Sequence, residues 1–364
     1  INGLCKVSNL FVIARNSSFA YKGKSVNIQQ VAKELGVRYI LEGSVQKAAD
    51  RVRITAQLID ATTGYHLWSE NYDRDLSDIF ALQDEITLKI MSALRIKLTW
   101  GEQARLWEGA ITNIQAFDKF ARGQDCFFRF NEKDNKQARY FSKEAINIDN
   151  DYAMAYILLG FTHMMDLAYG WSKSPIESFA HAEKNAEEAL ALNDSIDLAH
   201  CLLGWIYLLK RQHDEAINAG ERAIELSPNG ADAYAQLAMI LIYSDKIESA
   251  IKLLERALRL NPMPQSYYYL NLAIAYRENG QNEKAIEAAK KALSGTPDNI
   301  VLNLTLAASY ISLDQAEEAR KYVEEILRIY PGFSLENHAN VLPYKNQERL
   351  DKYINALRKA GLPE

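Results

Sequence analysis

Small residues recur at a fixed interval in the middle of the chain, and this interval limits the fold more than any other feature. The equivalent pairs are Gly204 and Ala238, Ala216 and Ala250, Ala223 and Ala257, and Pro228 and Pro262, each pair being 34 residues apart. A period of that length is typical of stacked helix pairs. Small side chains let two helices approach closely, and each proline ends the second helix of its unit. The sequence therefore predicts an all-α superhelical solenoid.

The same sites continue on both sides of this regular pair, which predicts six units between residues 113 and 333. The first unit carries a short insertion near Phe130 to Asp134, and the second carries a longer one around Gly170 to Pro175. Insertions between the helices of a unit fall on one edge of the array and are candidate contact loops. Residues 334–364 are predicted to cover the end of the array, with a charged helix from about Asn346 to Ala360.

Residues 1–76 follow a different pattern, typical of a small mixed α/β sheet domain. Leu10–Ala14 is a short apolar run suited to a buried strand. Asn27 can cap a helix that Gly36 ends. Three strand-like runs follow between residues 39 and 72, and apolar residues alternate with polar ones from Val52 to Leu58. The chain as a whole is thus predicted to be an α+β multidomain protein, with a strand, a helix and a three-stranded meander before the solenoid.

Residues 77–112 are predicted to connect the two parts by helices. Ser77 can cap a helix whose apolar residues, from Ile79 to Leu94, recur at spacings of three and four. No stretch rich in glycine, serine or proline intervenes between Leu76 and Asn113. We therefore expect the two domains to be coupled rather than loosely tethered.

Charge and cysteine content narrow the classes of partner and compartment. The formal net charge is −5 with both signs interspersed, so nothing favours nucleic acid or an anionic membrane surface. No apolar run approaches the roughly 18 residues of a membrane span, and no membrane contact is expected from this chain. Three widely spaced cysteines suit a reducing, cytoplasmic compartment. A periplasmic location stays open if an upstream membrane span exists, and so does a homo-oligomer.

Catalytic patterns are missing from the sequence. The six histidines show no metal-ligand spacing, and no two cysteines have the two-residue gap of a zinc site. His200 and Cys201 are adjacent, but neighbouring helical side chains point about 100° apart and cannot act as base and nucleophile. We therefore predict no catalytic residue, no metal and no cofactor in this chain. The chain starts at Ile1 without an initiator methionine, so we expect a fragment whose full-length protein can carry an enzyme domain.

The repeated units resemble the tetratricopeptide repeat, on the small residues and prolines named above. This resemblance implies a concave groove, lined by the first helix of each unit, that binds a protein or peptide partner. By register the groove residues are Phe161, Met165, Cys201, Trp205, Leu209, Met239, Tyr243, Tyr267, Ile274 and Arg277. Methionine adapts its shape and tryptophan offers a broad face, which suits an apolar helix or segment. The alternative is that these side chains only pack between helices or under the sheet domain.

The amino-terminal part resembles the TolB amino-terminal-like (FlgO-like) domain. The matching stretches are Val12–Phe19, Tyr21–Lys24, Ala32–Gly36, Tyr39–Val45, Arg51–Asp60 and Trp68–Asp75. The family domain normally opens with a further strand and most of a helix, of which Ile1–Val7 look like the remnant, so the front of the sheet is expected to be missing. In that family the domain often lies between a class III adenylate/guanylate cyclase domain, or a winged-helix regulator, and tetratricopeptide repeats. The resemblance implies that this chain is the repeat-containing carboxy-terminal region of a cyclase-like protein. It gives no catalytic residue to carry over to this sequence.

Two functions follow as hypotheses. The first is a protein-interaction and regulatory module, in which the groove binds a protein or peptide partner and the α/β domain transmits or stabilises that state towards an attached cyclase. The second is a sensor, in which the α/β domain of a membrane-attached or transcriptional regulator binds a small ligand.

Overall fold

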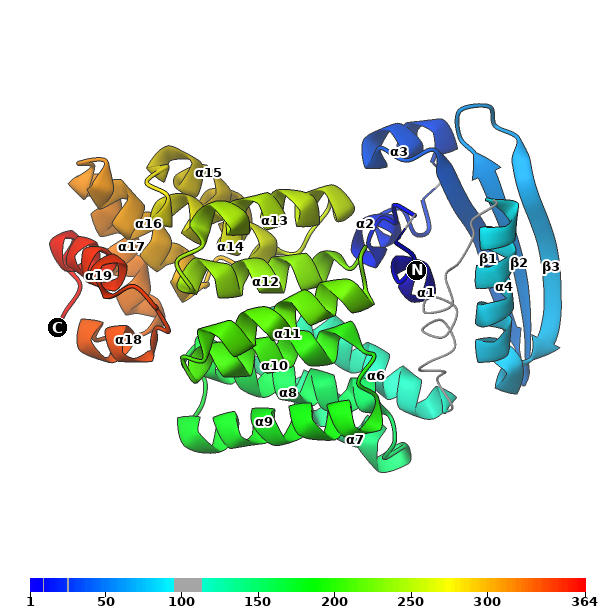
Figure 1. Ribbon diagram of the computed structural model, residues 1–364, viewed down its shortest axis with the longest axis horizontal. Helices are drawn as coiled ribbons and strands as arrows, with labels where there is room; N and C mark the ends of the chain where they lie inside the picture. The colour runs from blue at the N-terminus through cyan, green and yellow to red at the C-terminus, as the bar shows by residue number, and fades with distance from the viewer. Residues whose placement is uncertain (9, 25, 95–112) are drawn as a thin grey trace.

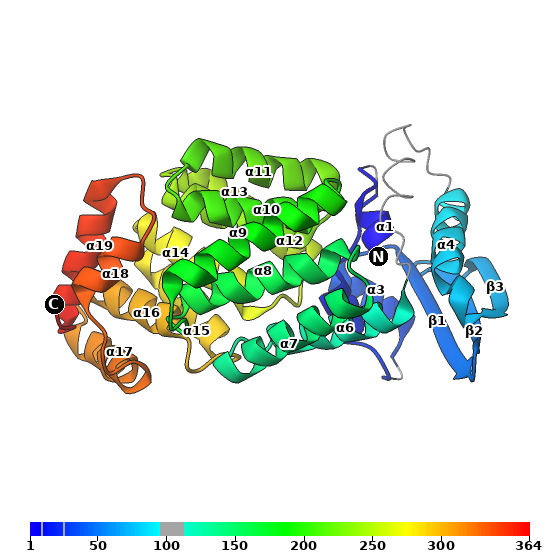
Figure 2. The ribbon, with the colours of Figure 1, turned by 90° about the horizontal axis from the view of Figure 1, so that it is seen from below.

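The computed structural model describes residues 1–8, 10–24, 26–94 and 113–364 of the chain. A small antiparallel sheet lies at one end of the molecule, and a curved stack of helices makes up the rest (Figure 1). Figure 2 shows the same arrangement turned by 90°, with the chain's C-terminus at the end of the stack farthest from the sheet. The predicted mostly helical solenoid with a small sheet at its front is confirmed.

The sheet contains three strands in the order β1-β2-β3, all antiparallel. The strands are β1 (Tyr39–Ala48), β2 (Arg51–Asp60) and β3 (His66–Asp75). Helix α4 (Ile79–Ala93) follows a short 3-10 turn (Leu76–Asp78) and lies across one face of the sheet (Figure 1). The alternation of β2 places Val52, Ala56 and Leu58 on that face, where they are buried. The predicted connecting segment beyond α4, residues 95–112, lies outside the described residues.

The strand predicted at Leu10–Ala14 is wrong, because this run bonds to the helical array instead of to the sheet. The Ala14 amide donates to the Leu260 carbonyl over 2.8 Å. The Phe11 ring lies 5.5 Å and 4.7 Å from the guanidinium carbons of Arg256 and Arg259. An apolar run signals burial. Here Phe11 and Ala14 pack on the repeats, whereas Ile13 packs on Val31 and Leu35 of the amino-terminal part.

Three short helices accompany this run, namely α1 (Asn2–Cys5), α2 (Arg15–Phe19) and α3 (Ile28–Leu35). As the sequence predicts, the Asn27 side chain caps α3 by accepting from the amides of Gln29 and Gln30, and Gly36 ends it at φ 62°.

The amino-terminal segment is fixed to the ends of two repeat units by buried hydrogen bonds. Asn229, which is 2% exposed, donates through Nδ2 to the Val7 carbonyl over 2.8 Å. One unit further on, the Ser17 hydroxyl donates to Asn261 Oδ1 and accepts from the Met263 amide, each over 2.7 Å. Because Ser17, Asn229 and Asn261 are all buried, these bonds fix the segment that precedes α3 to the repeats.

Helices α6 to α17 form consecutive pairs, each pair packed on the next. Their bounds are α6 (Ile114–Phe127), α7 (Glu132–Ile148), α8 (Ala153–Ala168), α9 (Pro175–Leu192), α10 (Asp197–Leu209), α11 (His213–Leu226), α12 (Ala231–Tyr243), α13 (Ile247–Leu260), α14 (Ser266–Glu278), α15 (Asn282–Leu293), α16 (Ile300–Ser312) and α17 (Ala316–Ile329). Two further helices, α18 (Leu335–Val341) and α19 (Gln347–Ala360), follow and pack on the last pair.

The predicted small sites are the points of closest helix approach. Ala216, Ala223, Ala250 and Ala257 are all fully buried. At Gly204 a Cβ atom would lie only 2.9 Å from Ile240 Cδ1 and 3.3 Å from the Ala216 carbonyl oxygen. The 34-residue period is therefore a packing requirement, since larger side chains would separate the paired helices.

The turns inside the regular units share one left-handed backbone conformation. Arg211, Asp245, Gly280 and Asp314 all have positive φ, between 58° and 75°, and each lies one unit after the one before. A left-handed residue reverses the chain between two helices with very few residues. Only one of the four is glycine, which is why composition alone does not reveal the feature.

His163 gives the array an acid-sensitive position. It is 7% exposed, and its Nδ1 has no hydrogen-bond partner among the described residues. Burial, with the charge of Arg139 as a smaller cause, lowers the pKa of His163 from 6.5 to about 3. A histidine with a lower pKa in the folded state stabilises the fold above its unfolded pKa and loses that contribution as pH falls through the window between the two values.

We expect the His163→Gln variant to lose less stability in acid than the unmodified chain. Between pH 6 and 4 one proton taken up on unfolding corresponds to about 1.4 kcal/mol per pH unit, and this slope should disappear from the variant. Urea unfolding at several pH values measures it, with His66→Gln as the control because His66 is exposed on β3. Equal slopes for the His163 variant and the unmodified chain would contradict this assignment.

Candidate functional site

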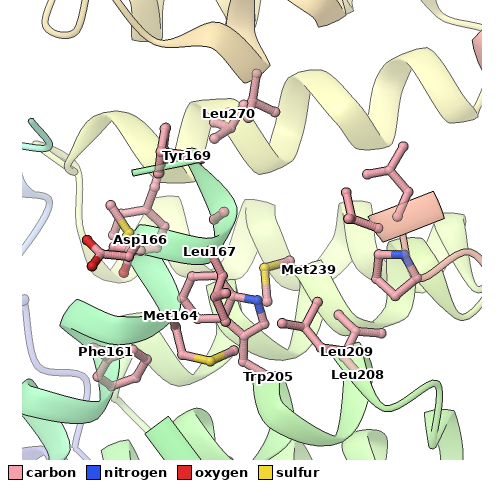
Figure 3. Close-up of a pocket in the computed structure, with 18 of the residues that line it drawn as sticks. Phe161, Met164, Asp166, Leu167, Tyr169, Trp205, Leu208, Leu209, Met239 and Leu270 are labelled. Carbon is pink, nitrogen blue, oxygen red and sulfur yellow. The ribbon is translucent and has the colours of Figure 1, made fainter. Parts of the chain in front are cut away.

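A large apolar cavity lies on the concave side of the stack. Its volume is about 1020 Å³, and its walls come from the first helices of the units together with the segment from α18 to α19. Figure 3 shows Phe161, Met164, Trp205 and Met239 gathered around it from helices α8, α10 and α12. Ring and thioether contacts continue along the wall, where the Phe161 and Trp205 ring centroids are 6.3 Å apart. The cavity is the concave groove of the solenoid, lined mainly by hydrocarbon and sulfur.

Nine of the ten groove residues predicted from register lie in the wall of this one cavity. They are Phe161, Met165, Trp205, Leu209, Met239, Tyr243, Tyr267, Ile274 and Arg277. The structure brings them together because the first helices of successive units face the same side, so that one register position repeats along the wall.

Cys201 does not reach the cavity, although it lies one helical turn before Trp205. It is fully buried, and burial together with the nearby charges of Asp197 and Asp232 raises the pKa of its thiol well above the usual value. Burial likewise raises the pKa of Cys5 to about 12, with the same two carboxylates contributing. Cys201 packs in a buried cluster with Ile157, Phe161 and Ala233 of the neighbouring helices. Both thiols are held in the unreactive protonated form.

Arg277 lies in the wall but offers no free positive charge. Its side chain is 7% exposed and pairs with Glu278, itself 6% exposed, over 2.6 Å. The same guanidinium donates to the Tyr344 hydroxyl over 2.8 Å and lies 3.7 Å from the centre of the Tyr353 ring. Arg277 therefore fastens α14 to the carboxy-terminal segment and is not a clamp for a partner's carboxylate.

The register argument missed the residues that close the cavity. Phe130, in the insertion of the first unit, contacts Tyr267 of the fifth with ring centroids 6.1 Å apart. Tyr169, beside the insertion of the second unit, accepts a hydrogen bond from Asn299 Nδ2 over 3.1 Å. The two insertions had been predicted as contact loops, and the contacts that they make are with the far side of the same solenoid.

The carboxy-terminal segment closes another part of the wall. Arg211 donates to the carbonyls of Leu342 and Tyr344 over 3.1 Å and 3.3 Å. The Lys345 amide donates to the Tyr243 carbonyl over 2.9 Å. Residues 341–344 are thereby held against units three and four, where Leu342 and Tyr344 line the cavity.

The described residues contain neither a candidate metal site nor a helix that could span a membrane. No cluster of three or more histidine, cysteine, aspartate or glutamate side chains in that part of the chain could hold a metal ion. Across the same residues, every helix is too short or too polar to cross a bilayer.

Helix pairs repeated every 34 residues around a concave cavity are typical of tetratricopeptide-repeat proteins. Models of the tetratricopeptide repeat match residues 197–229, 236–300 and 276–336. These matches lie in the regular units. The region from 197 to 336 therefore carries tetratricopeptide repeats.

One relative is similar over more than half of this chain. The protein named "Putative adenylate cyclase 3" of Rhizobium meliloti (strain 1021) is 44% identical over 219 residues, which is 60% of this chain and 37% of that protein. The chain thus matches little more than a third of the relative's length.

Solved structures of other repeat proteins are also similar to this chain. The Cut9–Hcn1 complex structure aligns with 77% of this chain and 52% of its own at 16% identity and a TM-score of 0.47. The structure titled as YrrB, a TPR protein with an unusual peptide-binding site, aligns with 55% of this chain and 97% of its own at 19% identity and a TM-score of 0.34.

Proposed function

We propose that this chain is a non-catalytic interaction module whose cavity holds an apolar segment of a partner protein. One observation carries the proposal: nine side chains from the second to the fifth units converge on a single apolar cavity on the concave face. Aromatic and methionine side chains of this kind are those that contribute most to binding when a partner's apolar side chains fill the space between them.

Several polar side chains of the wall are already hydrogen-bonded within the chain, and this favours an α-helical partner segment over an extended one. Asp232 accepts from the Tyr268 hydroxyl over 2.7 Å and also from Tyr267. Asn271 donates to the Ala235 carbonyl. With these polar groups engaged, and with Gln236 Oε1 as an acceptor that has no partner among the described residues, the wall offers few partners to the N–H and C=O groups of an extended chain. Leaving those groups unpaired is costly. A helix satisfies its own backbone and presents only side chains.

We also propose that the module belongs to a cyclase-type signalling protein of the cytoplasm. The relative named as an adenylate cyclase and the resemblance of residues 8–98 to the TolB amino-terminal-like domain support this origin. Asn229 and Asn261 bond to Val7 and Ser17, so the amino-terminal segment that leads to the sheet is attached to the repeats. A change in the repeats on partner binding can be transmitted to the sheet through this attachment. The sequence of the complete gene product tests this part: a cyclase domain upstream is expected, and a winged-helix domain there would contradict it.

Photo-crosslinking from the wall tests the binding proposal. A benzophenone amino acid in place of Trp205 is expected to capture a defined polypeptide in cells, whereas the same group in place of Tyr140 is not. Tyr140 is 53% exposed on α7 and outside the cavity wall, which makes it the matched control.

Once the partner segment is known, alanine variants give the strength of the contact. We expect Trp205→Ala and Met239→Ala each to weaken binding of that segment by about tenfold or more, measured by calorimetry. Tyr140→Ala should leave it unchanged. Equal affinities for all three variants would overturn the assignment of the cavity as the binding site.

A further inference from the structure

The cavity is bridged by contacts between distant units of the chain. The ring contact of Phe130 with Tyr267 and the hydrogen bond of Asn299 with Tyr169 join the first two units to the fifth and sixth. The Tyr169 ring is itself stacked on Trp171 at 4.9 Å and an interplanar angle of 19°. These side chains form a clasp, defined here as Phe130, Tyr169, Trp171, Tyr267 and Asn299. The clasp narrows the concave side, and the space that it bounds, called the chamber here, stays partly open to solvent.

The volume of this chamber is that of a small-molecule site. About 1020 Å³ lies at the upper end of the roughly 300–1,000 Å³ typical of ligand pockets, which are likewise apolar with few polar groups. Water inside an apolar chamber forms few hydrogen bonds, so an apolar molecule that replaces it is favoured.

Each charged side chain of the wall is already bonded within the chain. Asp166 pairs with Arg139 over 2.6 Å, and Arg277 pairs with Glu278. Asp232 holds two tyrosine hydroxyls, and Arg211 donates to two carbonyls.

The histidine of the wall, His338, is neutral as well. Burial, and then the charge of Arg277, lowers the pKa of His338 to about 4, so this imidazole carries no charge at pH 7. A ligand bearing a charge would therefore lose hydration inside the chamber without gaining a counter-ion.

We propose that the chamber binds an uncharged long-chain aliphatic molecule. The ligand lies among Phe161, Met164, Trp205 and Met239 and occupies the space that the partner segment would take. This goes beyond the proposed function, because it assigns the chamber a small-molecule ligand that competes with the partner.

Three probes with one chain and different head groups test the proposal on the full chain. Calorimetry with 1-decanol should show binding, while decanoate and decyltrimethylammonium should bind at least tenfold more weakly. In the series from 1-octanol to 1-decanol each added methylene should strengthen binding about fourfold. Absence of decanol binding, or binding of either charged probe as tight as that of decanol, would overturn it.

Cavity-filling variants locate the site. Met239→Trp and Leu209→Trp both fill the chamber from α12 and α10, and each is expected to weaken decanol binding at least tenfold. Tyr140→Trp, outside the wall, should bind decanol like the unmodified chain. Two filling variants are used so that misfolding of one, detected by its thermal unfolding, leaves the other to decide; unchanged binding in a folded filling variant would contradict the site.

The outcome for decanol and the outcome for the partner are separable. If crosslinking from position 205 captures a polypeptide while decanol fails to bind, the ligand proposal falls and the interaction module stands. If decanol binds but no polypeptide is captured, the ligand proposal stands and the interaction-module proposal falls.

Discussion

Replacing Arg277 by methionine should lower the free energy of unfolding by about 3–5 kcal/mol, because it leaves a buried carboxylate without its main partner. Glu278 is 6% exposed, and its nearest other cation is Arg349, with Nη1 3.8 Å away. The change also removes the contact of the guanidinium with the Tyr353 ring, which joins α14 to α19. Urea unfolding followed by circular dichroism measures the loss.

The double variant Arg277→Met, Glu278→Gln distinguishes an unpaired charge from lost packing. Removing the carboxylate charge as well should recover a large part of the stability, since the cost lies mainly in the buried unpaired ion. The exposed pair of Arg320 with Glu317 is the control, because its side chains are 63% and 83% exposed and Arg320→Met should change stability by less than about 1 kcal/mol. Equal small losses at both arginines would show that the Arg277 cluster does not hold the carboxy-terminal segment.

Replacing Gly204 by leucine should be similarly damaging, because α10 packs closely on its neighbours at this position. Even a methyl group there would lie 2.9 Å from Ile240 Cδ1 and 3.3 Å from the Ala216 carbonyl oxygen. Three further carbon atoms can be placed only by separating the helices, which we expect to cost about 3 kcal/mol or more.

Gly295→Leu is the matched control for this change. Gly295 is exposed, and the nearest atom to a Cβ there is the Ala292 carbonyl oxygen at 3.8 Å. Thermal unfolding of the two variants should show a clear fall in melting temperature for Gly204→Leu and almost none for Gly295→Leu. A Gly204→Leu variant as stable as the control would mean that the 34-residue small sites do not set the helix spacing.

The array was predictable because its strongest determinant is local in the sequence. Positions such as Ala216 and Ala250 carry the same small residue in equivalent places, and both are fully buried in the structure. The face of each first helix followed from the same register, which is why Trp205 and Met239 lie in the cavity wall as the repeat implies. The boundaries of α3 followed from Asn27 and Gly36, whose capping roles depend on neighbouring backbone groups alone.

What could not be predicted depends on segments far apart in the sequence. The apolar run at residues 10–14 is buried as expected, but against Arg256 and Arg259, about 240 residues away, and not in a strand. Cys201 has the register of Trp205, yet it is buried between the helices, in a cluster with Ile157 and Ala233. The clasp pairs, Phe130 with Tyr267 and Tyr169 with Asn299, depend on the curvature of the whole stack, which no single unit encodes.

The methionine methyl groups provide the most direct measurement of whether the hollow of the stack is where this chain holds another molecule. Of the six methionines, Met154, Met164, Met165 and Met239 line the cavity, whereas Met91 and Met263 do not. In carbon-13 methyl-methionine NMR spectra, addition of the crosslinked partner segment or of 1-decanol should shift the signals of the first four and leave those of Met91 and Met263 in place. Shifts confined to Met91 and Met263, or binding that moves none of the four cavity signals, would contradict the account.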